Sequence, residues 1–209
     1  MRLTGSCPRC RLPMDGDRDE CPVHGAQPRL WRPRVPAYEA FAEHLRTAGR
    51  FPTLLPWPLS PGWSVSDFGV VVDGADRTLA TVTCCSGTTE VDGRVDVLVV
   101  AEEAGVGLGG RCAGLPGADP GADFGQGPPA ARLRVGSQSV PVWPVSTSHA
   151  AGDLDRSVVA GEADGRWLWL VMHPASAILL LQEEWLLRDV SGIGPPLVEL
   201  PFSGPGPDW

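Results

Sequence analysis

Two pairs of metal-ligating residues near the start of the chain place the strongest constraint on its fold. The first pair is Cys7 and Cys10, and the second pair is Cys21 and His24, with ten residues between the pairs. Two intervening residues allow a tight turn to carry both ligands of a pair on one side of the backbone, so each pair supplies half of a tetrahedral site. The spacing therefore predicts one site in which all four residues bind a single zinc ion.

The residues around the four ligands favour such a site. Pro8 and Pro22 follow the first ligand of each pair and fix the backbone φ angle within each turn. Four protein ligands leave no open coordination position, so we expect a structural rather than a catalytic zinc. The alternatives are two unrelated turns with free thiols, or a disulfide. The polar segment between the pairs is too short for a core of its own, which predicts a hairpin whose order depends on the metal.

Composition bounds the rest of the molecule. The 209 residues suffice for one core and a small module, and a content of 43% hydrophobic and 20% charged residues is ordinary for a globular protein. No apolar run is long enough for a membrane span, and none near the N-terminus resembles a signal peptide. We therefore expect a cytoplasmic protein, in which paired cysteines favour metal over disulfide.

The 17 basic residues are all arginines and are unevenly distributed. Residues 1–50 contain nine Arg and six acids, a net charge of +3, whereas residues 51–209 contain eight Arg and nineteen acids, a net charge of −11. The larger part should repel nucleic acid. One basic segment could instead contact phosphates and stack a base, although we favour a proline-stiffened linker whose tryptophan packs on the protein. That segment contains Arg29, Trp31, Arg32 and Arg34.

Helical periodicity is clear in the segment Ala37–Gly49. Tyr38, Phe41 and Leu45 lie at helical spacing, and the glycine at the end of the segment is a typical stop signal. The next segment, Phe51–Trp63, contains four prolines and two tryptophans. Neither a helix nor a central strand tolerates this proline density, so we expect an extended segment anchored by its tryptophans. A peptide-docking surface is the alternative.

Apolar runs separated by turn residues predict β-strands in the larger part of the chain. The first three strands have short connections, which predicts an antiparallel meander. The third strand is nearly all apolar and is therefore expected to be buried on both faces. The predicted strands are Val65–Val72, Thr78–Cys85, Val95–Ala101, Arg132–Val135, Val140–Val145, Ser157–Gly161 and Trp167–His173.

A glycine-rich segment follows the third of these strands. A glycine-rich loop after a strand can bind a phosphate, but no amphipathic helix follows here and the Lys and Ser or Thr of a Walker-type loop are missing. Two adjacent glutamates on a strand point to opposite faces and cannot form an acid/base pair. Residues 114–129 are expected to be irregular. The candidate ligand-binding residues are Glu102, Glu103, Gly105, Gly107, Gly109 and Arg111.

The segment Ser176–Val190 fits two structures. A helix is possible, with the proline two residues earlier in its first turn. We favour a hairpin whose second strand is Ile178–Glu183, followed by a short helix at Trp185–Asp189. The tail after Gly192 is rich in proline and glycine, which predicts irregular or disordered structure.

No pattern in the sequence predicts catalytic residues. Cys84 and Cys85 are neighbours on a predicted strand, so their side chains diverge and burial would leave them inert. Cys112 could be exposed and is the one nucleophile candidate. His149 and His173 lie in no recognisable catalytic motif. A missing motif does not exclude an enzyme, because catalytic residues converge from distant positions.

The chain contains five groups of residues that resemble those of a known family: Cys7–Cys10 with Cys21–Gly25, Leu55–Leu59, Pro61–Trp63, Glu102–Gly114, and Ala160–Glu162 with Gly165–Trp169. In them the chain is similar to an uncharacterised family of GC-rich Gram-positive bacteria, whose members sometimes carry an automatic phosphotransacetylase label. No phosphotransacetylase motif is present, and 209 residues leave little room for the two domains of that enzyme. The resemblance therefore implies an architecture and no activity.

The sequence thus predicts an α+β protein, in which a small N-terminal zinc ribbon or knuckle module precedes a mainly antiparallel β-sheet domain with few helices. The expected division is a zinc module at 1–27, a basic linker and helix at 28–50, the sheet domain at 51–192 and the tail at 193–209. Our leading hypothesis is a cytoplasmic protein-interaction or adaptor protein with a structural zinc and an unidentified protein partner. The alternatives are a small-molecule-binding or enzymatic domain using Gly105–Gly110, and nucleic-acid binding through Arg29–Arg34. We lean away from an enzyme.

Overall fold

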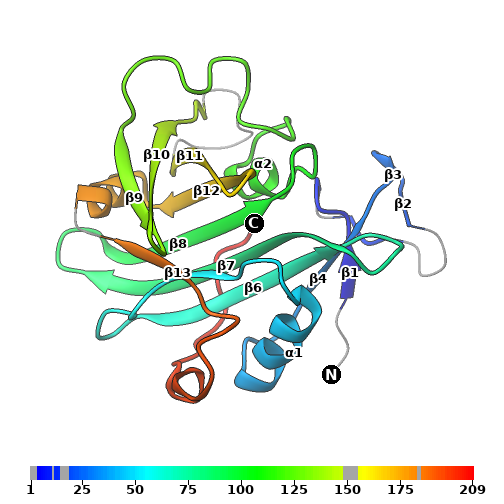
Figure 1. Ribbon diagram of the computed structural model, residues 1–209, viewed down its shortest axis with the longest axis horizontal. Helices are drawn as coiled ribbons and strands as arrows, with labels where there is room; N and C mark the ends of the chain where they lie inside the picture. Colours follow the sequence, from blue (N-terminus) through cyan, green and yellow to red (C-terminus); the bar gives the residue numbers. More distant parts are fainter. Residues whose placement is uncertain (1–3, 11, 15–18, 148–154, 183–184) are drawn as a thin grey trace.

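The computed structural model describes residues 4–10, 12–14, 19–147, 155–182 and 185–209 (Figure 1). Its helices are α1 (Tyr38–Ala48), α2 (Leu108–Ala113) and the 3₁₀ helices η1 (Ala175–Gln182) and η2 (Pro195–Glu199). Its strands are β1 (Thr4–Ser6), β2 (Glu20–Cys21), β3 (Gly25–Ala26), β4 (Arg29–Arg32), β5 (Leu54–Pro56), β6 (Ser64–Val72), β7 (Thr78–Thr89), β8 (Gly93–Glu102), β9 (Ala131–Val135), β10 (Gln138–Pro144), β11 (Ser157–Ala163), β12 (Arg166–His173) and β13 (Leu186–Asp189).

An 11-stranded sheet forms the body of the protein, in the order β1-β4-β6-β7-β8-β12-β11-β10-β9-β13-β5. Neighbouring strands are antiparallel, except that β13 runs parallel to β9. The predicted antiparallel sheet with few helices is therefore confirmed, and so are the seven predicted strands, each within one or two residues except for the longer β7.

The sheet curls so that its last strand lies against its middle. Thr81 and Thr83 of β7 each donate a side-chain hydrogen bond of 2.6 Å to a backbone carbonyl of the β5 segment, at Pro52 and Leu54. The strands from β7 round to β5 thus enclose one apolar core, to which β8 contributes alternate valines and β12 contributes Leu170.

A second apolar core covers the other face of the same strands. It contains Leu98, Val100 and Trp169, together with residues of α2 and the last residue of the sequence, Trp209. The predicted burial of both faces of the third strand is therefore confirmed, and β12 also contributes side chains to both cores. A third cluster packs α1 onto β6 through Phe41 and Phe68, and Figure 1 shows α1 lying beside that strand.

The segment after β12 differs from the favoured expectation. Residues 175–182 form the helix η1 where a strand was expected at Ile178–Glu183, and residues 186–189 form the strand β13 where a helix was expected. The physical reason is tertiary: β13 fills the gap between β9 and β5, and Leu187 is fully buried there. An apolar run without alternation leaves helix and strand undecided until such a pairing is available.

Two further expectations need correction. The glycine-rich segment contains the helix α2, although no helix was expected there. The tail after Gly192 is irregular apart from η2, as expected, but it is ordered: Leu197 and Leu200 are buried and Trp209 is 2% exposed. Large apolar side chains in the tail are sufficient to fix it on the body.

The helix predicted at Ala37–Gly49 is confirmed, and Gly49 ends it with a φ angle of +60°. The 11-stranded sheet contains strands from three of the predicted segments: β1 from residues 1–27, β4 from residues 28–50, and the others from residues 51–192. The division of the chain into modules stays a prediction. Among the described helices, none combines the length and the apolar character that crossing a membrane requires.

Candidate metal centre

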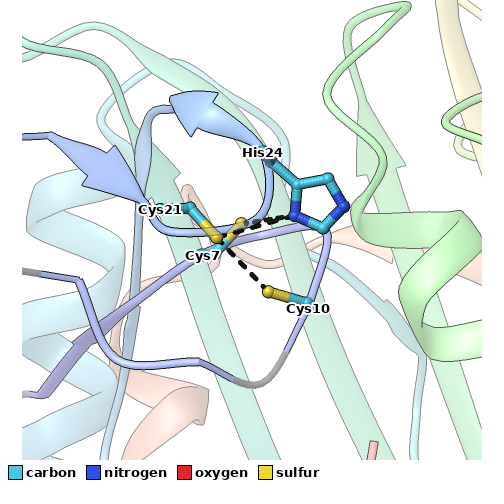
Figure 2. A group of neighbouring side chains, drawn as sticks. All are labelled: Cys7, Cys10, Cys21 and His24. Carbon is cyan, nitrogen blue, oxygen red and sulfur yellow. Dashed lines mark hydrogen bonds between the residues drawn. The ribbon is translucent and has the colours of Figure 1, made fainter.

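The four predicted ligands come from two short turns beside the edge of the sheet. Cys7 follows β1 directly, Cys21 ends β2, and His24 lies in the turn before β3. The strands β2 and β3 pair with Cys21 opposite Gly25, whose φ angle of +66° lets the chain turn sharply after the histidine. Figure 2 shows the four side chains pointing toward one another.

The ligand atoms of the four residues lie close together. His24 Nδ1 lies 3.6 Å from both Cys7 Sγ and Cys21 Sγ, and the sulfur atoms of Cys10 and Cys21 are 3.5 Å apart. All four ligand atoms lie within 4.8 Å of one another. Typical zinc bond lengths imply tetrahedral edges of about 3.8 Å between sulfurs and about 3.5 Å between sulfur and nitrogen. The four residues are thus close enough to hold a metal ion.

The two buried thiols differ in their readiness to ionise. Burial raises the pKa of Cys7 to about 12. Burial also acts to raise the pKa of Cys21, but hydrogen bonds from the backbone amides of Val23 and His24 and from neighbouring side chains outweigh it and bring that pKa to about 6. A metal binds thiolates, so loading this site must release a proton from Cys7 and will depend on pH.

The first ligand turn is attached to the body by α2. The guanidinium of Arg111 donates hydrogen bonds of 2.5 Å to Cys7 O and 2.8 Å to Cys10 O, the carbonyls of the two ligands themselves. Gly107 lies against the same turn, because a Cβ atom there would be 3.1 Å from the side chain of Arg9. Arg111 was predicted as a residue of a ligand loop, and its observed partners belong to the metal centre.

The last residue of the sequence completes this contact. The ring of Trp209 lies 4.2 Å from the guanidinium of Arg32 and 5.3 Å from that of Arg111. Its Nε1–H donates a hydrogen bond of 2.9 Å to Asp67 Oδ2, which also pairs with Arg32. Burial raises the pKa of Asp67, and Arg32 opposes that rise. Strand β4, helix α2 and the tail therefore meet beside the metal centre.

The glycine-rich segment is filled by the protein's own groups. Glu102 is fully buried, and its carboxylate accepts hydrogen bonds from the amides of Leu108 (2.7 Å) and Gly109 (3.2 Å). Burial raises the pKa of Glu102 to about 7, although these amides oppose the rise. A Cβ atom on Gly109 would be 2.3 Å from Trp169 Nε1, so close packing explains this glycine.

The other predicted members of the segment lie around Glu102. Gly105 and Gly107 have φ angles of +84° and +86°, which favour glycine. Glu103 is partly exposed, and its Oε2 lies 3.9 Å from Nη1 of Arg77. Ligand binding by Glu102, Glu103, Gly105, Gly107, Gly109 and Arg111 stays a prediction, and the position that an anion would take at the start of α2 holds the Glu102 carboxylate.

The candidate nucleic-acid residues lie on and after β4. Arg29 pairs with Asp19 and Arg32 pairs with Asp67. Trp31 packs against Ala48 and two valines of β6, and Arg34 is exposed. Nucleic-acid binding is untested, but two of the three cations are engaged within the protein.

The remaining cysteines and histidines form no second cluster of ligands in the described residues. Cys84 and Cys85 are buried in different clusters, as predicted. Cys112 is also fully buried, contrary to the exposure considered for it, and burial raises its pKa to about 12. Burial lowers the pKa of His173. His149 lies outside the described residues.

Comparisons with known proteins identify a family for the chain but no activity. No curated protein and no solved structure matches it. The model of one family of unknown function matches residues 1–208, nearly the whole chain. This agrees with the predicted membership of an uncharacterised family. The chain belongs to the family of unknown function DUF6758.

Proposed function

We propose that this protein is a cytoplasmic protein-interaction module with one structural zinc ion. The ion holds the ribbon, which consists of the two ligand turns together with β2 and β3. The donor set of three sulfurs and one imidazole nitrogen is typical of structural zinc, and the distances between these atoms match the edges of a zinc tetrahedron. The ion would hold together two turns that share little apolar surface, since among the described residues of this region only Cys7, Met14 and Cys21 are buried in their cluster. Zinc would therefore supply most of the folding energy of this region.

The observation that carries the interaction proposal is the exposure of Val23. This valine lies inside the second ligand turn and is 67% exposed, although valine is usually buried. Leu12 stands two residues after the ligand Cys10, as Val23 stands two residues after the ligand Cys21, and is 39% exposed. Apolar side chains at the tips of metal-held turns are suited to a protein partner, because their position is fixed before binding and little entropy is lost on contact.

The attachment of the ribbon supports the same role. Arg111 binds the first ligand turn to α2, which fixes the position of that turn on the body. Figure 1 shows the β2–β3 hairpin projecting beyond the sheet edge, where a partner could reach it. Four protein ligands leave no coordination position for a substrate, which favours a structural rather than a catalytic metal.

The test is site-specific crosslinking in cells. A photo-crosslinking residue replaces Val23 in one variant and Val91 in a control, because Val91 is an 86% exposed valine in the distant turn between β7 and β8. We expect one protein to crosslink at position 23 and not at position 91. We also expect the Cys7→Ser/Cys10→Ser background to abolish this product.

The proposal fails if positions 23 and 91 give the same products, or if the product at position 23 persists when the two ligands are replaced. The first result would show that the ribbon is not selective. The second would show that the surface does not depend on the metal.

A further inference from the structure

A cavity of about 330 Å³ lies at one end of the curled sheet, and none of the metal-ligand residues lines it. The tips of the β9–β10 and β11–β12 hairpins form part of its wall, and the segment leading into β5 forms another part. Its volume falls at the lower end of the range of small-molecule sites, and the mouth of a curled sheet is a common place for them. Among its lining residues are Arg50, Leu54, Ala101, Gln138, Arg166 and Leu168.

Arg166 points into this end of the sheet. Side chains alternate along β12, and Leu168 and Leu170 belong to the enclosed core, so Arg166 continues the inward-facing row. Its guanidinium lies 4.8 Å from the ring of Phe51. Its Nε atom is buried and has no hydrogen-bond partner among the described residues. A buried donor without a partner is costly, and a bound acceptor would relieve that cost.

Arg50 adds a second cation to the same wall. It is exposed, and no ion pair joins it to any residue in the described part of the chain. Two cations without carboxylate partners on one cavity make a local site for an anion.

The acidic residues of the wall are already engaged. Asp164 Oδ1 accepts a hydrogen bond of 2.6 Å from Gln138 Nε2. Asp189 Oδ1 accepts hydrogen bonds from the amides of Thr53 (3.0 Å) and Ser191 (3.1 Å). The carboxylates therefore help to fix the hairpin tip and the β5 segment. Arg166 donates one hydrogen bond of 3.4 Å from Nη1 to Asp164 O, and its Nε has no partner among the described residues.

We propose that this cavity binds a small molecule with an oxyanion head, a carboxylate or a phosphate, and an apolar body. Arg50 and Arg166 bind the head, since the guanidinium fork matches both groups. Leu54, Ala101 and Leu168 contact the body. The cavity is lined by neither the metal ligands nor the glycine-rich segment. The proposal of an anion site is therefore independent of the proposal of an interaction module.

The experiment uses the full zinc-loaded chain and three probes: phenyl phosphate, benzoate and inorganic phosphate. Isothermal titration calorimetry measures affinity, and NMR follows the arginine Nε–H resonances. We expect saturable binding of phenyl phosphate or benzoate, tighter than that of inorganic phosphate because the apolar body adds contact. The probe that saturates identifies the head group as phosphate or carboxylate.

Variants locate the site. Arg50→Gln and Arg166→Gln are each expected to weaken binding about tenfold or more, because each removes a charge-assisted hydrogen bond. Arg132→Gln is the control, since Arg132 is an exposed arginine of β9 outside the cavity lining. Arg50 is also exposed, so its variant keeps the test valid even if Arg166→Gln fails to fold.

Two results would overturn the proposal. One is that none of the probes gives saturable binding at millimolar concentration. The other is that Arg132→Gln weakens binding as much as Arg50→Gln does, which would mean that the anions respond to overall charge and occupy no site.

Discussion

Replacing Arg111 by methionine should release the first ligand turn from the body. The guanidinium donates to Cys7 O at 2.5 Å and to Cys10 O at 2.8 Å, and methionine keeps the apolar stem while removing both donors. A hydrogen bond from a charged group contributes about 1.5–3 kcal/mol, and two bonds from one guanidinium are not additive. We therefore expect the free energy of unfolding to fall by about 3 kcal/mol in the zinc-loaded protein.

Urea unfolding followed by tryptophan fluorescence measures this loss, with Arg132→Met as the matched control on β9. The metal-free protein should lose much less, because the ligand turns depend on the metal for their order. Transfer of zinc to a coloured chelator should also be faster in Arg111→Met than in the control. An equal loss of stability with and without zinc, or zinc release at the wild-type rate, would refute the assigned role of Arg111.

Three further substitutions test the packing around α2. Gly109→Ala should lower the free energy of unfolding by about 3 kcal/mol, measured in urea, because the added Cβ would lie 2.3 Å from the buried Trp169 ring. Glu102 has a pKa raised from 4.5 to about 7, so wild-type stability should fall as pH rises through that window, because only the unfolded chain ionises freely there. Glu102→Gln should remove about 3 kcal/mol of this change in the free energy of unfolding with pH. An unchanged slope of stability against pH would contradict the raised pKa of Glu102. Trp209→Ala should cost about 3–5 kcal/mol and lower the midpoint of thermal unfolding, because the ring is 2% exposed; an unchanged midpoint would mean that the tail is not part of the core.

Local sequence patterns were sufficient to predict those elements whose structure depends on neighbouring residues in the chain. Alternation and apolar runs predicted β8 and β12, because a strand buried on both faces must be apolar along its length. The helix α1 followed from its spacing and from Gly49. The ligand residues of the metal centre followed from two turns of fixed spacing, which bring side chains together without any long-range contact.

Features that depend on distant segments were not predictable in this way. The strand β13 forms because it pairs with β9 on one side and β5 on the other. The sequence of residues 186–189 contains no signal for these distant pairings. Arg111 lies 104 residues from Cys7, so no spacing rule connects them. The inward position of Arg166 follows from the alternation along β12, but its cavity depends on five separate segments. The glycines from 105 to 110 suggested a phosphate loop, whereas Glu102 and Trp169 show that close packing explains Gly109.

The zinc centre is tested most directly by X-ray absorption spectroscopy at the zinc edge on the freshly purified protein, with metal content measured on the same sample. The account predicts one zinc per chain, bound by three sulfurs at about 2.3 Å and one nitrogen at about 2.0–2.1 Å. The Cys21→Ser variant should lose one sulfur from the shell or lose the metal. A protein purified without zinc, or a shell that includes oxygen in place of the expected sulfurs, would contradict the closed centre formed by Cys7, Cys10, Cys21 and His24.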